Sequence, residues 1–262
     1  MNLKSNTNYQ YLCHIRRPKF CHCTGPSFSQ DRPCIYESLE IQAPRLHYFK
    51  FRSKVKCVYF KNTPLLKKVV IFNDSHIQTE EESALQMESN LIELFRSLPA
   101  LRVLHFDNHF IQFLAASGVL KRPSLTAVHL NSLKLRRICL EKMREMSCVL
   151  FIVRISPNLE DIIIRLFNST GAADLNPSLE SLDVEEYSDV KLDQPRRVKL
   201  EGFTGTRNQM ALAKLLLTKS PGLMKMIIKP NAEGCDERQG FLILKELIRL
   251  QRPSTVAEII YG

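Results

Sequence analysis

A short pattern, Pro-x-Leu-x-x-h-x-h with h an apolar residue, recurs along the chain and restricts the folds that it can adopt. It reads "SPNLEDIIIRL" at residues 156–166 and "SPGLMKMIIKP" at residues 220–230. Proline cannot continue a helix, and the alternating apolar residues that follow it are typical of a short strand. Each copy therefore predicts the end of one connection and the beginning of one strand. Copies begin at Pro44, Pro64, Pro99, Pro123, Pro157, Pro177 and Pro221, with looser copies at Pro195 and Pro253.

Amphipathic helices are predicted between these copies. The stretches "NLIELFRSL" and "EKMREMSCVLFIV" space their apolar residues as one face of a helix does. Thr206 and Gln209 have the spacing of a capping box, in which each side chain satisfies an unpaired N–H at the start of a helix. The predicted apolar faces consist of Leu91, Leu94, Phe95 and Leu98; of Met143, Met146 and Leu150; of Leu212, Leu215 and Leu216; and of Phe241, Leu244, Leu247 and Ile248.

The order of these elements favours parallel strands, because a helical connection carries the chain back over the sheet. The intervals between the prolines fall around the period range of repeat proteins. We therefore predict an α/β fold, a short and irregular solenoid with one parallel sheet. A compact α/β domain with a closed topology is the alternative.

Composition and cysteine usage indicate a reduced compartment. The chain is 44% hydrophobic and 24% charged, which is ordinary globular usage. It shows no signal-peptide pattern and no apolar run of membrane-spanning length, so we expect a cytoplasmic or nuclear location. Zinc sites use close pairs of Cys and His, and the cysteine-rich cluster near the N-terminus matches that spacing poorly. No metal or cofactor is predicted for that cluster, which comprises Cys13, His14, Cys21, His22, Cys23 and Cys34.

Excess positive charge is confined to the first part of the chain. Residues 1–73 hold thirteen Lys and Arg against three Asp and Glu, whereas residues 74–262 hold twenty-four of each. Within "FKFRSKVKCVYF", residues 49–60, a cation stands at every second position, so one strand would present all of them on one face. Such a face either contacts phosphate, nucleic acid or an acidic protein segment, or is a solvated face that guards an edge strand. These candidate partner-contact residues are Lys50, Arg52, Lys54 and Lys56.

No catalytic constellation is apparent. His105, His109 and His129 lie in or beside predicted strands, but no Ser or Cys nucleophile accompanies them. "GFTGT" at residues 202–206 lacks the lysine and glycine spacing of a phosphate-binding loop and predicts a tight turn before a helix. We predict no enzymatic activity.

The stretches "LIELFRSLPALRVLHFDNHFIQFLAA", "VKLEGFTGTRNQMALAKLLLTKSPGLMKMIIKP" and "LKELIRLQRPSTVAEIIY" resemble plant F-box proteins with leucine-rich repeats and an FBD domain. The resemblance implies a leucine-rich-repeat-like solenoid closed by an FBD-type βαβαβ segment. It divides the chain into residues 1–38, an irregular basic segment with cysteines; residues 39–193, the repeat array; and residues 194–262, the FBD domain. Residues 1–38 do not resemble the F-box with which such proteins begin, which indicates a truncated or alternatively started product.

The resemblance also implies a function. It predicts a non-enzymatic interaction module like the substrate-recognition part of an F-box subunit of a cullin-type ubiquitin ligase. The partner would be an unidentified protein substrate, with a Skp-type adaptor and a cullin only where an F-box is supplied elsewhere. No membrane partner is expected, and nucleic acid is not favoured. Polyanion or nucleic-acid binding through the basic strand region 45–68 is the alternative.

Overall fold

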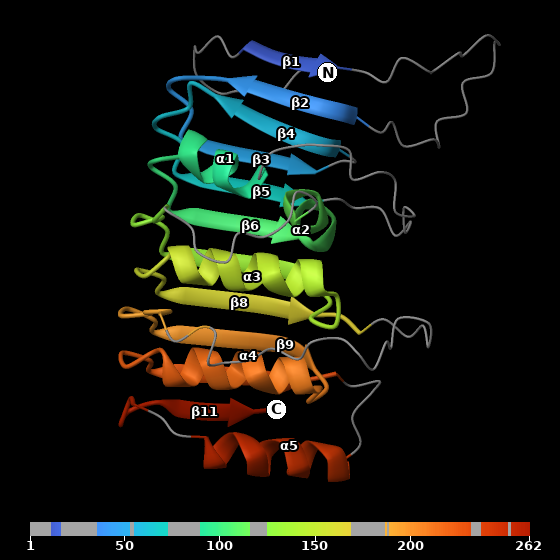
Figure 1. Cartoon of the computed structure of the whole chain (residues 1–262), viewed down its shortest axis with the longest axis vertical. Helices are drawn as coiled ribbons and strands as arrows, with labels where there is room; N and C mark the ends of the chain where they lie inside the picture. The colour runs from blue at the N-terminus through green and yellow to red at the C-terminus, as the bar shows by residue number, and fades with distance from the viewer. Residues whose placement is uncertain are drawn as a thin grey trace, which may run out of the picture.

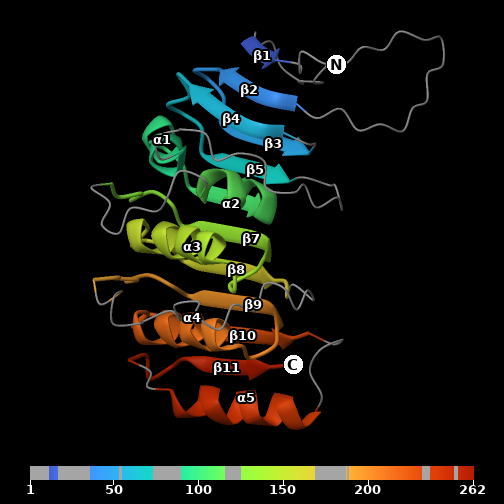
Figure 2. The same ribbon diagram turned by 45° about the vertical axis from the view of Figure 1, so that its right-hand side comes forward.

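The structure, a computed structural model, describes residues 12–16, 36–52, 55–72, 90–115, 125–168, 187, 189–231, 237–250 and 253–262. These residues form a mixed α/β structure in which strands are stacked along the long axis and helices lie over one side of them (Figures 1 and 2). None of the described helices is long and apolar enough to cross a membrane. The strands are β1 (Leu12–Arg16), β2 (Tyr36–Gln42), β3 (Tyr48–Arg52), β4 (Val55–Lys61), β5 (Lys68–Phe72), β6 (Val103–Asp107), β7 (Ser132–Ile138), β8 (Asp161–Leu166), β9 (Arg197–Phe203), β10 (Lys225–Pro230) and β11 (Glu258–Tyr261). The helices are α1 (Asn90–Ser97), α2 (Asn108–Ala115), α3 (Met143–Ile155), α4 (Arg207–Thr218) and α5 (Glu237–Arg249).

Eight strands form one sheet in the order β11-β10-β9-β8-β7-β6-β5-β3. Every neighbouring pair in it is parallel, as the sequence predicts, and β3 and β11 are its two edges rather than a closed barrel. A second sheet of three strands, β1-β2-β4, was not expected; β1 and β2 pair antiparallel, and β2 and β4 pair parallel. It joins the main core through Phe60 of β4, whose ring meets that of Phe49 edge-on at 5.5 Å between centroids.

The same turn precedes most strands of the large sheet. In each case the N–H of a buried leucine donates to the carbonyl three residues before it, as Leu66 does to Thr63 at 3.2 Å and Leu223 to Ser220 at 3.2 Å. Before β7 the leucine is Leu130, which bonds to Ala127 at 3.1 Å. The copy that we placed at Pro123 is therefore wrong in position, because Val128 occupies the place that proline holds elsewhere. The copy at Pro177 lies outside the described residues.

Hydrogen bonds at the strand starts repeat from one strand to the next. The carbonyl of Lys67 accepts from the N–H groups of Arg102 at 2.8 Å and Val103 at 3.0 Å. The carbonyl of Glu160 accepts in the same way from Arg196 at 2.8 Å and Arg197 at 3.0 Å. This shared start aligns equivalent residues of successive strands in rows across the sheet.

The face of the sheet that meets the helices is apolar throughout. Alternate strand residues point to it, and equivalent residues of successive strands are directly paired. Their side chains are almost fully buried, which makes this layer the centre of the core. The two rows are Val69, Leu104, Leu133, Ile162, Val198 and Met226; and Ile71, Phe106, Leu135, Ile164, Leu200 and Ile228.

Three of the predicted helices have the expected buried faces. Leu94 of α1, Met146 of α3 and Leu215 of α4 are all buried. Thr206 caps α4, since its hydroxyl oxygen accepts from the N–H of Gln209 at 3.4 Å. The reciprocal half of the predicted capping box differs, because the Gln209 side-chain oxygen accepts from the backbone of Thr204 at 2.8 Å and Gly205 at 3.1 Å.

The predicted apolar face of α5 was wrong in two of its four residues. Phe241 is 66% exposed and Ile248 is 56% exposed, whereas Ile243 and Leu247 are buried. The helix is rotated because Ile243 packs against Gly205, which lies in the turn before α4. This contact holds the end of the helix layer to the preceding repeat.

Two strands of the large sheet, β7 and β9, contain the same β-bulge near their carboxyl ends. Arg137 in β7 and Gly202 in β9 both have positive φ, of 60° and 73°, and the pairing shifts by one residue beside each. A glycine adopts this conformation without strain, whereas a residue with a Cβ does so at a cost of about 1–2 kcal/mol. The bulge is therefore part of the repeat even where its sequence carries arginine.

The C-terminal part of the chain has the element order β9-α4-β10-α5-β11, the βαβαβ order that the resemblance implies. Its first strand pairs with β8 along Asp161 to Arg165, so the sheet continues without interruption across residue 194. The domain boundaries at residues 38 and 193 stay predictions.

Candidate binding surface

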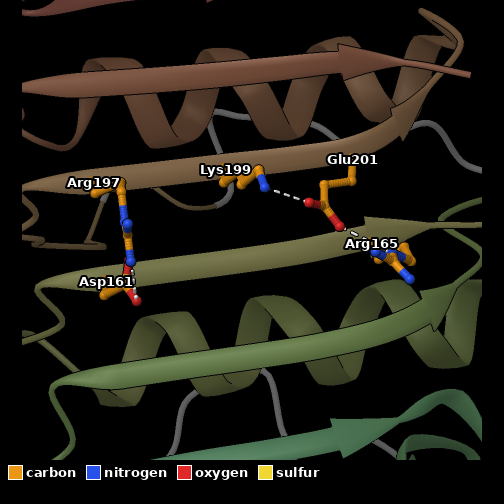
Figure 3. A network of polar contacts seen from close by, with 5 residues as sticks. All are labelled: Asp161, Arg165, Arg197, Lys199 and Glu201. Carbon is orange, nitrogen blue, oxygen red and sulfur yellow. Dashed lines mark hydrogen bonds and ion pairs between the residues drawn. The ribbon is translucent and has the colours of Figure 1, made fainter.

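The second face of the eight-stranded sheet, which we call the open face, carries no described helix. Figure 3 shows part of it, with the strands in front and the helices behind. Strand residues point to it alternately with those of the core, so that polar and apolar side chains form rows across the strands. Its first row is Tyr48, Lys68, Val103, Ser132, Asp161, Arg197, Lys225 and Glu258, and its second is Lys50, Val70, His105, Lys134, Ile163, Lys199, Ile227 and Ile260.

In β8 to β11 most charges of the open face are paired with one another, and Lys229 of β10 is the exception among the described residues. The Arg197 guanidinium donates to both carboxylate oxygens of Asp161, at 2.7 Å and 3.0 Å. That hydrogen bond raises the pKa of Arg197. Lys225 lies 3.6 Å from the carboxylate of Glu258 on the next strand.

Glu201 is the centre of a second group of paired charges (Figure 3). Arg165 donates to one of its carboxylate oxygens at 2.9 Å, and Lys199 contacts the other. Burial alone would raise the pKa of Glu201, but the hydrogen bonds from Lys199 and Arg165 and their positive charges lower it. Each of the three carboxylates in this half of the open face is therefore paired with a cation of the same face.

Between these charged pairs lie three isoleucines, which we call the aliphatic strip, although Lys199 of β9 stands between Ile163 and Ile227 in their row. Ile163, Ile227 and Ile260 occupy the second row, and each is only half-buried. Isoleucines on a face without helices expose apolar area that a protein partner can cover.

The basic half of the open face, which consists of its residues in β3, β5, β6 and β7, is different. In the described part of the chain none of its five cations forms an ion pair with a carboxylate. Two of them lie over aromatic rings instead: Lys68 is 5.2 Å from the ring centroid of Tyr48, and Arg136 is 4.9 Å from that of Phe72. The five cations are Lys50, Arg52, Lys68, Lys134 and Arg136.

His105 lies in the middle of the basic half, beside Val70 and Lys134 in the pairing of the sheet. The pKa of His105 is lowered to about 4. Burial is the largest cause, the positive charges of Lys68 and Lys134 add to it, and the charge of Asp161 acts in the opposite direction. The imidazole is therefore neutral at physiological pH. Among the described residues no nucleophile is hydrogen-bonded to it, so their geometry gives no reason to treat it as a general base.

The four cations that the sequence singled out are not carried by one strand. Lys50 and Arg52 are exposed on β3, in the large sheet, whereas Lys56 belongs to β4, in the small sheet. Lys54 lies outside the described residues, between these two strands. The stretch that we interpreted as one strand therefore supplies two strands in different sheets, and the partner contact of these four residues stays a prediction.

Sequence reasoning missed Lys68, Lys134 and Arg136, although a signal for one of them was present. Open-face residues stand four, six and eight positions after the proline of the copies at Pro44, Pro64, Pro99, Pro157 and Pro221, which places Lys68 four residues after Pro64. For β7 this numbering failed, because its copy has no proline at the turn.

A polar cluster at the carboxyl ends of β7, β8 and β9 is structural. The Thr206 hydroxyl donates to Glu141 at 2.6 Å, and the Gln209 amide donates to Asn168 at 3.0 Å. Buried Glu145 accepts from the N–H of Cys139 at 2.9 Å. These bonds tie the loops of successive strands together. The described residues contain no group of His, Cys, Asp and Glu that could hold a metal ion.

Comparison with known proteins identifies one curated relative. An F-box/FBD/LRR-repeat protein of Arabidopsis thaliana is 27% identical to this chain over 230 residues, which cover 85% of this chain and 53% of the relative. The chain thus spans about half the length of the relative that it matches. No protein-family model matches the chain, and no solved structure does.

Proposed function

Since this chain is related to the plant F-box/FBD/LRR-repeat proteins, we propose that it is a non-enzymatic protein-interaction module. In this proposal it acts as the substrate-recognition part of an F-box subunit of a cullin-type ubiquitin ligase. We also propose that its α/β structure is a short leucine-rich-repeat-like solenoid and that β9 to β11 with their two helices are an FBD segment, which the βαβαβ order supports.

The observation that supports this proposal is the open face. A parallel sheet is usually covered by helices on both sides, whereas the open face carries no described helix and its two rows combine charged and polar residues with the isoleucines of the aliphatic strip. A surface of this kind is suited to hold a protein segment, because it offers both apolar area and hydrogen-bonding groups.

Site-specific photo-crosslinking tests the location of the substrate site. A photoreactive amino acid is placed at Ile163 or Ile227 on the open face, and in control proteins at Lys214 or Lys245, exposed residues of the helix layer. We expect the two open-face probes to capture the same protein in plant cells, and the two control probes not to capture it. Equal capture from both layers would contradict the proposed location.

A ligase role requires a Skp-type adaptor and a cullin. We propose that these associate with the chain where an F-box is supplied, and co-purification of the tagged chain with both proteins tests this. Recovery of both in moderate salt supports the ligase role. If neither is recovered with a folded chain that still captures its substrate, the chain is a detached recognition arm.

A further inference from the structure

We propose that the basic half of the open face binds an extended segment of the partner protein that is rich in Asp and Glu, with apolar residues of the same segment covering Ile163 and Ile227. This inference rests on the function proposed above, and it specifies the chemistry of the substrate.

Charge complementarity is the first argument. The five cations of the basic half have no carboxylate partner among the described residues, whereas four of the five open-face cations of β8 to β11 have one and only Lys229 of that described half does not. Cations gathered on one face repel one another, and an anionic ligand replaces this repulsion with attraction. The basic half is therefore the part of the open face where an acidic ligand gains the most electrostatic binding energy.

The spread of these cations favours several carboxylates over one phosphate group. Lys50 on β3 and Lys134 on β7 are separated by three strand spacings, or about 14 Å. A phosphate group is usually held by donors that converge on it, above all by paired arginines. Separate cations along a face suit an extended segment, in which every second side chain points to the same side.

The remainder of the open face argues against a nucleic acid. In β8 to β11 most open-face cations are already engaged by carboxylates, as Arg197 is by Asp161, so a long polyanion that left the basic half would gain less there. Single-stranded nucleic acid also uses successive aromatic side chains on which its bases stack, whereas Tyr48 is the one exposed aromatic residue among the described strand residues of the open face. A peptide with both acidic and aliphatic residues matches both halves.

His105 provides a local reporter of such binding. Because Lys68 and Lys134 help to depress the pKa of its imidazole, carboxylates that approach these two lysines should raise that pKa above about 4. A ligand bound elsewhere on the chain would leave it unchanged.

Fluorescence anisotropy with defined peptides is the experiment. The probe is a labelled 12-residue peptide in which glutamate alternates with valine and serine, and the matched peptide carries glutamine in place of glutamate. Further arms use phosphoserine in place of glutamate and a 12-nucleotide oligouridylate. The protein is compared with Lys68→Gln/Lys134→Gln, and with Lys214→Gln/Lys245→Gln as a control that removes the same charge from the helix layer.

We expect the glutamate peptide to bind about tenfold more tightly than the glutamine peptide, a preference that two or three surface charges can supply. Lys68→Gln/Lys134→Gln should reduce the affinity about tenfold, and the control variant less than twofold. Nuclear magnetic resonance of the imidazole should show the pKa of His105 rising with the bound glutamate peptide.

Three results would overturn the inference. They are equal binding of the glutamine peptide, tighter binding of the oligouridylate that Lys68→Gln/Lys134→Gln abolishes, and binding of the phosphoserine peptide alone. If open-face crosslinking still captures one protein but no acidic peptide binds, this inference fails and the proposed function stands. If crosslinking is not confined to the open face, the proposed function fails first.

Discussion

Replacement of His105 by glutamine should remove part of the pH dependence of stability. In the folded chain the pKa of His105 is lowered from 6.5 to about 4 by burial and by Lys68 and Lys134, against the opposing charge of Asp161. Between these two pH values the unfolded chain binds the proton and the folded chain does not. Folding stability therefore rises as the pH increases from 4 to 6.5, and the neutral imidazole costs nothing above that window.

The size of the effect follows from the shift. If the shift were fully expressed, lowering the pH from 7.5 to 5 would cost the wild type about 2 kcal/mol through His105 alone. The side chain is only half-buried, and solvent screening reduces this cost to about 1 kcal/mol. Carboxylates that titrate in the same range affect both proteins equally, so the difference between wild type and His105→Gln isolates the histidine.

Urea unfolding at pH 5 and pH 7.5 measures this difference. We expect the free energy of unfolding of the wild type to fall by about 1 kcal/mol more than that of His105→Gln. Lys134→Gln should raise the pKa of His105 and shrink the difference, whereas Lys245→Gln on α5 should leave it unchanged. An imidazole that titrates near 6.5 in the folded protein, or parallel pH profiles for wild type and His105→Gln, would refute the reasoning.

Three further predictions concern the core and the loops. Gly202→Ala should destabilise the fold by about 2–4 kcal/mol in urea unfolding, because the new Cβ would lie 2.7 Å from the carbonyl oxygen of Leu166 and the residue has a φ of 73°. Glu145→Ala should cost about 1–3 kcal/mol by leaving the buried N–H of Cys139 without its carboxylate acceptor, and Glu145→Gln, which keeps an acceptor oxygen, should cost less. Burial raises the pKa of the Cys148 thiol, with the charge of Glu145 adding to it, so mass spectrometry should detect alkylation of Cys148 only at the rate of unfolding.

The repeat could be predicted because its constraints are local. A proline at the turn, an obligatory buried leucine two residues later and alternating apolar residues after it are all visible in one stretch of sequence, as in Pro157 to Ile164. The parallel sheet followed from the spacing of such stretches. At β7 the prediction failed, because the turn needs a backbone conformation that Val128 supplies as well as proline does.

The features that sequence reasoning missed depend on contacts between distant residues. β3 ends at Arg52 in the large sheet and β4 begins at Val55 in the small sheet, so one basic stretch without proline or glycine is divided between two sheets. The orientation of α5 depends on the fit of Ile243 against Gly205, almost forty residues earlier in the chain. The alternation of apolar residues alone would allow either neighbouring face of that helix to be buried.

The two halves of the open face differ in how their cations are paired. This difference is the reason to interpret the basic half as a binding surface and not simply as a solvated face. A solvent-exposed sheet face can pair its charged side chains across neighbouring strands. In β8 to β11 Asp161 is paired with Arg197, and Glu201 with Arg165 and Lys199. The basic half instead keeps a cationic field strong enough to help hold the pKa of His105 near 4. Folding alone gains nothing from that repulsion, and proteins retain such local conflicts where a ligand relieves them. The repulsion among these cations destabilises the unliganded chain, and its relief favours the binding of an acidic segment. The Lys68→Gln/Lys134→Gln variant should therefore lose affinity for the acidic peptide while its folding stability stays the same or increases.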